Sequence, residues 1–121
     1  RPWLPIKIIN PHTGAYKDTF GLIDTGADEC CIPAFLAQEL GHNIDKGVPN
    51  TSSTAGGPAI GFAHTTTIVI CDLSMNCAHT IDSVPIDFQE HLPCVLLGVR
   101  SFLSQFNLHI NYPNFYFSIT K

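Results

Sequence analysis

The sequence predicts a mainly β fold, arranged as a barrel or a sandwich. The chain has 121 residues, about the length of one domain, so residues 1–121 are assigned to a single domain. Hydrophobic residues make up 45% and charged residues 13% of the chain, which excludes the composition of a disordered protein. Short apolar segments rich in β-branched residues are separated by turn signals, and this spacing is typical of all-β barrels and sandwiches.

The N-terminal segments predict a hairpin. Residues 4–9 are apolar apart from one lysine, and a turn cluster at 11–14 leads into a second strand-like segment at 15–23. The remaining strands are predicted at 65–71, 80–86, 94–97 and 115–119. The first two segments are rich in β-branched residues, the third is a continuous apolar run, and the fourth has alternating large residues.

Two short helices are expected between the strands. Pro33 suits the first turn of a helix that runs to Leu40, with Gly41 in the position that follows a helix C-terminus. A second helix is expected over 99–106, where apolar residues recur at the spacing of one helix face. These residues are Val99, Phe102, Leu103 and Phe106, and we expect them to pack in the core.

Charge and hydropathy exclude two classes of partner. The net charge is −4 and the basic residues are scattered, so the chain lacks the basic stripe that follows a phosphate backbone, and no nucleic-acid partner is expected. The apolar runs are far shorter than the ~20 residues that span a bilayer, so no membrane partner is expected for this segment.

The cysteines give a weaker prediction. Their number, five, is odd, which argues against a full disulfide framework and mildly favours a reducing compartment such as the cytoplasm. Cys71 and Cys77 flank a possible hairpin turn and could face each other across two strands, but two half-buried thiols are the interpretation we favour. Together with His79 they do not complete a four-ligand zinc site, so no metal and no cofactor is expected.

The segment 22–28 contains the residues best suited to chemistry. Asp24 directly follows an apolar strand, and Gly26 allows the backbone to turn sharply and approach a partner closely. The Thr25 hydroxyl can bond nearby backbone and hold the turn. By itself, an Asp-Thr-Gly triplet is more often an ordinary turn than an active site, so the flanking sequence must decide.

The flanking sequence resembles that of a known family. Asp24-Thr25-Gly26-Ala27, after the apolar residues 20–23, resembles the active-site signature of the retropepsin-like aspartic proteases, which include retroviral proteases and their cellular relatives. Residues 95–98 resemble the family's apolar-apolar-Gly segment, which packs beneath the active-site loop, and the small residues at 53–61 lie where the family carries its flap. The helix after Pro33 and the segment 111–114 are more similar to bacterial-type cellular members.

The resemblance implies a closed β-barrel of the acid-protease fold that acts as a homodimer on a peptide or protein substrate. It also implies site residues: Asp24 as the catalytic residue, Thr25, Gly26 and Ala27 as its support, and Asp28, Ala55, Gly56 and Gly57 as substrate-binding residues. Many relatives place an arginine directly after the Leu-Leu-Gly glycine, where it pairs with the acid equivalent to Asp28. Here Val99 holds that position and Arg100 follows. We therefore expect, with equal weight, either an ion pair between Asp28 and Arg100 or an Arg100 side chain that faces solvent.

The count of triplets supports a dimer on chemical grounds. An aspartic dyad needs two close carboxylates that share one proton, so that one acts as base and the other as acid. The chain contains one Asp-Thr-Gly triplet, which implies a twofold homodimer with Asp24 of each subunit on the axis. The strands at 4–9 and 115–119 are candidates for the dimer interface or, equally, for the core.

Two further hypotheses stay open beside an endopeptidase. The first is a retropepsin-fold dimer that associates or binds peptides with little or no catalysis. The second is an oxygen-rich metal site formed by Asp24, Asp28, Glu29 and nearby histidines, although the six histidines show no ligand spacing.

Overall fold

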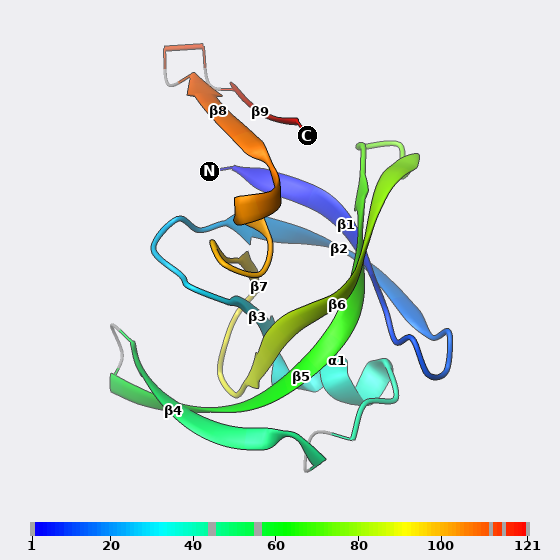
Figure 1. Ribbon diagram of the computed structural model, residues 1–121, viewed down its shortest axis with the longest axis vertical. Helices are drawn as coiled ribbons and strands as arrows, with labels where there is room; N and C mark the ends of the chain where they lie inside the picture. The colour runs from blue at the N-terminus through cyan, green and yellow to red at the C-terminus, as the bar shows by residue number, and fades with distance from the viewer. Residues whose placement is uncertain (1, 44–45, 55–56, 112, 115, 121) are drawn as a thin grey trace.

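The computed structural model describes residues 2–43, 46–54, 57–111, 113–114 and 116–120, and most of them lie in β-strands (Figure 1). In chain order the elements are β1 (Trp3–Ile9), β2 (Tyr16–Ile23), β3 (Cys30–Pro33), α1 (Ala34–Glu39), β4 (Val48–Thr54), β5 (Gly57–Cys71), β6 (Cys77–Gln89), β7 (Val95–Leu97), a 3-10 turn η2 (Leu103–Gln105), β8 (Asn107–Asn111) and β9 (Tyr116–Thr120). None of the helices in these described ranges is long and apolar enough to cross a membrane.

The strands close into a barrel, as the sequence predicts. They are hydrogen-bonded in the order β1-β2-β7-β3-β6-β5, and β5 pairs again with β1 to complete the circle. That closing contact runs antiparallel from the Ile6–Ile70 pair to the Ile9–Thr67 pair. β4 lies outside the closed part, as an edge strand beside the first half of β5.

Alternation along β1 explains how the barrel fills its interior. Leu4, Ile6 and Ile8 are buried, whereas Trp3 on the same strand is exposed. Because successive side chains of a strand point to opposite faces, the apolar residues of this segment line the core. Phe88 and Phe102 are fully buried there and are the largest such side chains.

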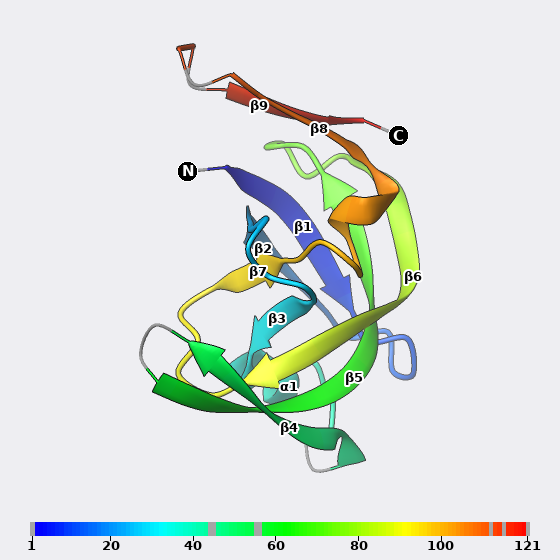
Figure 2. The ribbon, with the colours of Figure 1, turned by 60° about the vertical axis from the view of Figure 1, so that its left-hand side comes forward.

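The first strand, β1, and the last strand, β9, differ in how much of their backbone edge is free to pair with a partner. Over Ile6–Ile9, β1 pairs with β2 on one side and with β5 on the other, so this part of its backbone has no free edge, and its residues Leu4, Ile6 and Ile8 belong to the core. β8 and β9 form a separate two-stranded sheet and, within the described residues, pair only with each other. Figures 1 and 2 show this hairpin at the opposite end of the molecule from the β4–β5 hairpin.

The predicted helix after Pro33 is confirmed, and the one over 99–106 is wrong. Pro33 ends β3, α1 follows at once, and Gly41 adopts the positive φ of 73° expected after a helix. Beyond Gly98 the chain instead forms turns and the short η2. The amides of Val99 and Arg100 bond to a different loop, and Phe102 has a non-helical backbone. The apolar pattern still marks the core, since Phe102 and Leu103 are buried, but Val99 is exposed.

The preference for two free thiols at Cys71 and Cys77 is also wrong, because these residues form a disulfide. The two cysteines face each other at the end of the β5–β6 hairpin, with Cα atoms 3.9 Å apart. Asp72 shapes the connecting turn, because its Oδ1 accepts hydrogen bonds from the amides of Ser74 and Asn76. Cys30, Cys31 and Cys94 remain free, so the odd count reflects one disulfide and three thiols.

Candidate active site

The loop that contains Asp24 joins β2 to β3, and β7 lies between these two strands. β7 runs parallel to β2 and antiparallel to β3, where Leu96 faces Cys31. The Asp24 amide donates to the carbonyl of Leu97 over 3.1 Å, which extends the β2–β7 pairing by one residue. The start of the loop is therefore fixed by the barrel itself, and Asp24 is half-buried where the strand ends.

The triplet forms a tight turn around the Asp24 carboxylate. The amide of Gly26 donates to Asp24 Oδ1 over 2.9 Å, and the amide of Ala27 donates to the Asp24 carbonyl over 3.2 Å. A Cβ at position 26 would lie 3.3 Å from Asp24 Oδ1, so a residue without a side chain suits this turn. The arrangement orients one carboxylate oxygen and leaves Oδ2 for other partners.

The segment after β7 holds the rest of the loop. The amide of Val99 donates to the carbonyl of Ala27 over 2.8 Å, and that of Arg100 donates to the carbonyl of Asp28 over 2.7 Å. The buried hydroxyl of Ser101 accepts a hydrogen bond from the Cys30 amide over 2.9 Å. Ser101 could not be found from the sequence, because nothing in its neighbours distinguishes it from an ordinary surface serine.

Gly98 allows these two segments to approach. A Cβ on this residue would overlap the backbone of Glu29, including its carbonyl oxygen. Backbone cannot move aside as a flexible side chain can, so a larger residue at 98 would push the loop away from β7. The apolar-apolar-Gly segment thus packs against the loop, as the sequence analysis expected.

Asp28 and Arg100 meet through backbone and not through their charges. The ion pairs among the described residues are Lys7–Asp18 and Lys17–Glu39, and the side chains of Asp28 and Arg100 are both exposed. Of the two arrangements expected from the sequence, an Asp28–Arg100 ion pair or an Arg100 side chain that faces solvent, the structure has the second.

Acidic groups and thiols surround the end of the loop. Burial raises the pKa of Cys31 to about 12, and the nearby carboxylates of Asp87, Asp24 and Glu29 act in the same direction. Burial also raises the pKa of Cys30. Both thiols therefore stay protonated at neutral pH, so neither is suited to act as a nucleophile. Glu29 Oε2 is buried and has no hydrogen-bond partner among the described residues.

The segment expected to form the flap is a β-hairpin. β4 and β5 pair antiparallel up to Thr54 and Gly57, the last pair before the turn. Ala55 and Gly56, two of the expected substrate-binding residues, lie outside the described residues. In Figure 1 the β2–β3 loop and the turn end of this hairpin face the same, left-hand side of the barrel.

The described residues contain no group of three or more His, Cys, Asp or Glu side chains that could hold a metal ion. The hypothesis of a metal site at Asp24, Asp28 and Glu29 therefore gains no support from their arrangement.

Comparisons with known proteins identify the fold. No protein-family model and no curated protein sequence matches the chain. Among solved structures, it is similar to the crystal structure of a retropepsin-like aspartic protease from Rickettsia conorii, with a TM-score of 0.61 and 21% sequence identity. The match covers 88% of this chain and 92% of the other. This chain has the retropepsin-like fold. The retropepsin-like barrel thus bears out the fold that the sequence implied, with α1 as the one α-helix in the described residues.

Proposed function

We propose that the chain is one subunit of a homodimeric aspartic endopeptidase whose catalytic residue is Asp24. One observation carries the proposal: in a retropepsin-like barrel, the Asp-Thr-Gly turn sits where β2 ends, with the Asp24 carboxylate oriented by the Gly26 amide. Hydrogen bonds from the segment after β7 hold this loop. A carboxylate that is fixed on one oxygen and partly open to solvent is suited to act on a bound water.

The proposed chemistry needs the Asp24 carboxylates of two subunits to share one proton. The ionised carboxylate removes a proton from water, and the resulting oxygen bonds to the carbonyl carbon of the peptide. The protonated carboxyl gives its proton to the carbonyl oxygen, which forms a tetrahedral diol. Transfer of a proton to the peptide nitrogen then breaks the C–N bond and releases an acid and an amine.

The neighbouring residues receive supporting roles in this proposal. Thr25 braces the pair of loops, and Gly26 and Ala27 present backbone to the substrate. The exposed carboxylate of Asp28 and the residues Ala55, Gly56 and Gly57 bind an extended peptide, whose main chain can pair as an added strand. The closing of the β4–β5 hairpin over the substrate would shield the dyad and its bound water from bulk solvent.

The alternative is a dimerisation or peptide-binding module without catalysis. Two features favour it: Val99 replaces the arginine of many relatives, and Asp28 has no ion pair with Arg100 within the described structure. Both hypotheses need a dimer, and the β8–β9 hairpin offers sheet edges for one. They differ only in whether Asp24 performs hydrolysis.

Cleavage of a denatured protein mixture between pH 4 and 6 distinguishes the two hypotheses. We expect cleavage by the wild type and none by Asp24→Asn, which keeps the shape of the side chain. Asp18→Asn is the matched control, because Asp18 is an exposed aspartate on β2, the strand that precedes Asp24. Equal cleavage by the wild type and by Asp24→Asn would refute the peptidase proposal.

A further inference from the structure

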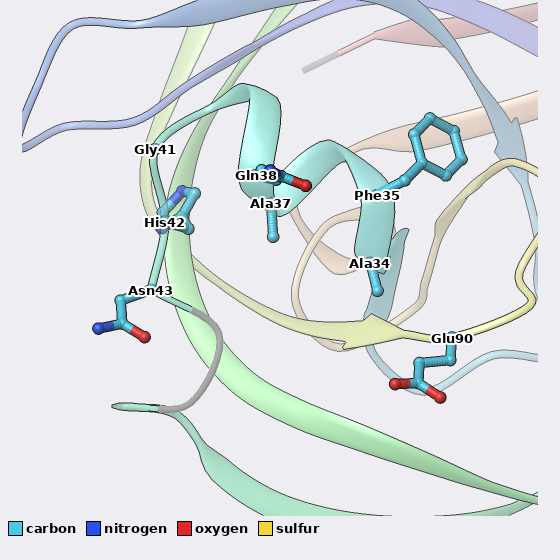
Figure 3. A pocket seen from close by; sticks show the side chains of 8 residues that line it. All are labelled: Ala34, Phe35, Ala37, Gln38, Gly41, His42, Asn43 and Glu90. Atoms are coloured by element: carbon cyan, nitrogen blue, oxygen red, sulfur yellow. The ribbon is translucent and has the colours of Figure 1, made fainter.

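A cavity of about 640 Å³ lies beside α1 (Figure 3). Its volume falls within the range of about 300–1,000 Å³ that is typical of ligand sites. The described residues that line it belong to α1, to the segment after α1 and to the turn after β6. None of them belongs to the Asp24 loop, so the cavity is separate from the candidate active site.

One wall of the cavity is fixed by the end of α1. The amide of Gly41 donates to the carbonyl of Gln38 over 3.1 Å, and the amide of His42 donates to the carbonyl of Ala37 over 2.9 Å. These two bonds form a Schellman motif, which ends many helices at a glycine of positive φ such as Gly41. The His42 ring is also held by the buried Phe88 ring, with the two centroids 5.2 Å apart. This wall is therefore formed before a ligand binds.

The opposite wall is fixed by the barrel. β3 and β6 run parallel to each other up to the pair Pro33–Gln89. The residues that follow this pair, Ala34 and Glu90, both line the cavity. Figure 3 shows the Glu90 side chain across the cavity from His42. The pairing of the two strands thus sets the distance of the Glu90 carboxylate from α1.

Between the two walls the cavity offers apolar surface and side-chain amides. In Figure 3 the methyl groups of Ala34 and Ala37 point toward the space between the walls, whereas the Phe35 ring points away from it. Gln38 and Asn43 are exposed and add amides that both donate and accept hydrogen bonds. A ligand that matches this lining has an apolar stem along α1 and polar groups at its ends.

The charge of the cavity favours a cation. Among the described residues, the lining contains one carboxylate, that of Glu90, and neither lysine nor arginine. Neither of the two ion pairs in the described part of the chain involves Glu90. Burial lowers the pKa of His42, so the neutral ring at pH 7 does not offset the carboxylate. A ligand that carries a cationic donor can therefore form a charge-assisted hydrogen bond with Glu90.

We propose that this cavity is a second binding site, which takes an arginine side chain of a peptide or protein partner. The guanidinium pairs with Glu90, the methylene groups lie along the methyls of Ala34 and Ala37, and the partner's backbone bonds to the amides of Gln38 and Asn43. Arginine suits the site better than lysine, because its planar group donates two parallel bonds to one carboxylate. The site does not depend on the proposed peptidase function.

An NMR titration of the isotope-labelled Asp24→Asn protein tests the proposal, because this variant leaves any peptide intact. The probe is the tripeptide Gly-Arg-Gly with blocked ends, added at millimolar concentration. We expect amide shifts at residues 34–43 and 90. The same tripeptide with citrulline keeps the shape without the charge and should bind about tenfold more weakly. Propylguanidinium, which has the cation without a peptide backbone, should also bind more weakly than the arginine peptide.

Two variants complete the test. Glu90→Gln should bind the arginine peptide no more tightly than the citrulline peptide. Glu39→Gln is the matched control, because Glu39 is an exposed acid of α1 that does not line the cavity, and it should bind as the parent protein does. The proposal is wrong if the shifts are absent or centred on residues 22–29, if Glu90→Gln binds unchanged, or if citrulline or propylguanidinium binds as tightly as the arginine peptide.

Discussion

Ser101 is predicted to be essential for holding the loop that contains Asp24, and Ser101→Ala tests this. Its hydroxyl is the acceptor for the Cys30 amide, and both residues are buried, with 6% and 0% of their surface exposed. The alanine variant removes the acceptor of that buried amide. A buried donor that loses its acceptor costs about 1–3 kcal/mol. For a domain of this size, each kcal/mol lowers Tm by about 4 °C.

Urea unfolding followed by fluorescence measures the loss directly. Ser104→Ala is the matched control, because the Ser104 hydroxyl donates to the Arg100 carbonyl over 2.8 Å on the exposed side of the same turn. We expect Ser104→Ala to stay within about 0.5 kcal/mol of the wild type. If Ser101→Ala were no less stable than Ser104→Ala, the hydrogen bond to Cys30 would not hold the loop, and the argument for this contact would be refuted.

Four further predictions follow from the same geometry. Gly98→Ala forces the Glu29 backbone away from β7 and should cost about 1–3 kcal/mol of unfolding free energy, measured by urea titration; an unchanged midpoint would contradict the close approach. Reduction of the Cys71–Cys77 disulfide should lower stability by about 2 kcal/mol, and Cys71→Ser/Cys77→Ser should make the protein insensitive to reductant. Cys31, with its pKa raised to about 12, should react with a thiol reagent at pH 8 only after denaturation, and rapid modification of the folded protein would show the burial to be wrong. The pKa of His42 is lowered in the folded protein, so the unfolded chain binds the proton more tightly. The free energy of unfolding should therefore be highest above about pH 6.5, the ordinary pKa of histidine, and should fall below it. Unfolding measured across this pH range should show a flatter slope for His42→Phe.

The sequence patterns predict β1, β2 and β7 and parts of β5 and β6, and they miss β3 and β4. Residues 4–9 and 15–23 become β1 and β2, because alternation and a turn cluster are local signals. β3 escaped prediction because it has four residues and ends at Pro33, which also suits a helix start. β4 is rich in small polar residues and becomes a strand by pairing with β5, a contact that local sequence does not encode.

In the candidate site, too, local features could be predicted from the sequence and contacts between distant segments could not. The Asp-Thr-Gly triplet and the glycine at 98 could be found in the sequence, because each meets a local requirement of the backbone. Ser101 could not, since its partner Cys30 is 71 residues away. The failed helix after Gly98 has a related cause: its apolar spacing is correct for the core, but its first amides are used by the loop that contains Asp24.

A subunit-mixing titration tests the central claim, that each chain contributes one Asp24 to a shared site. Wild type and Asp24→Asn are unfolded together, refolded at constant total concentration, and assayed for cleavage as the wild-type fraction varies. If two Asp24 carboxylates are needed in one dimer, activity follows the square of that fraction, and an equal mixture keeps about one quarter of it. An equal mixture that keeps about one half would mean that each chain acts alone, and would contradict the account.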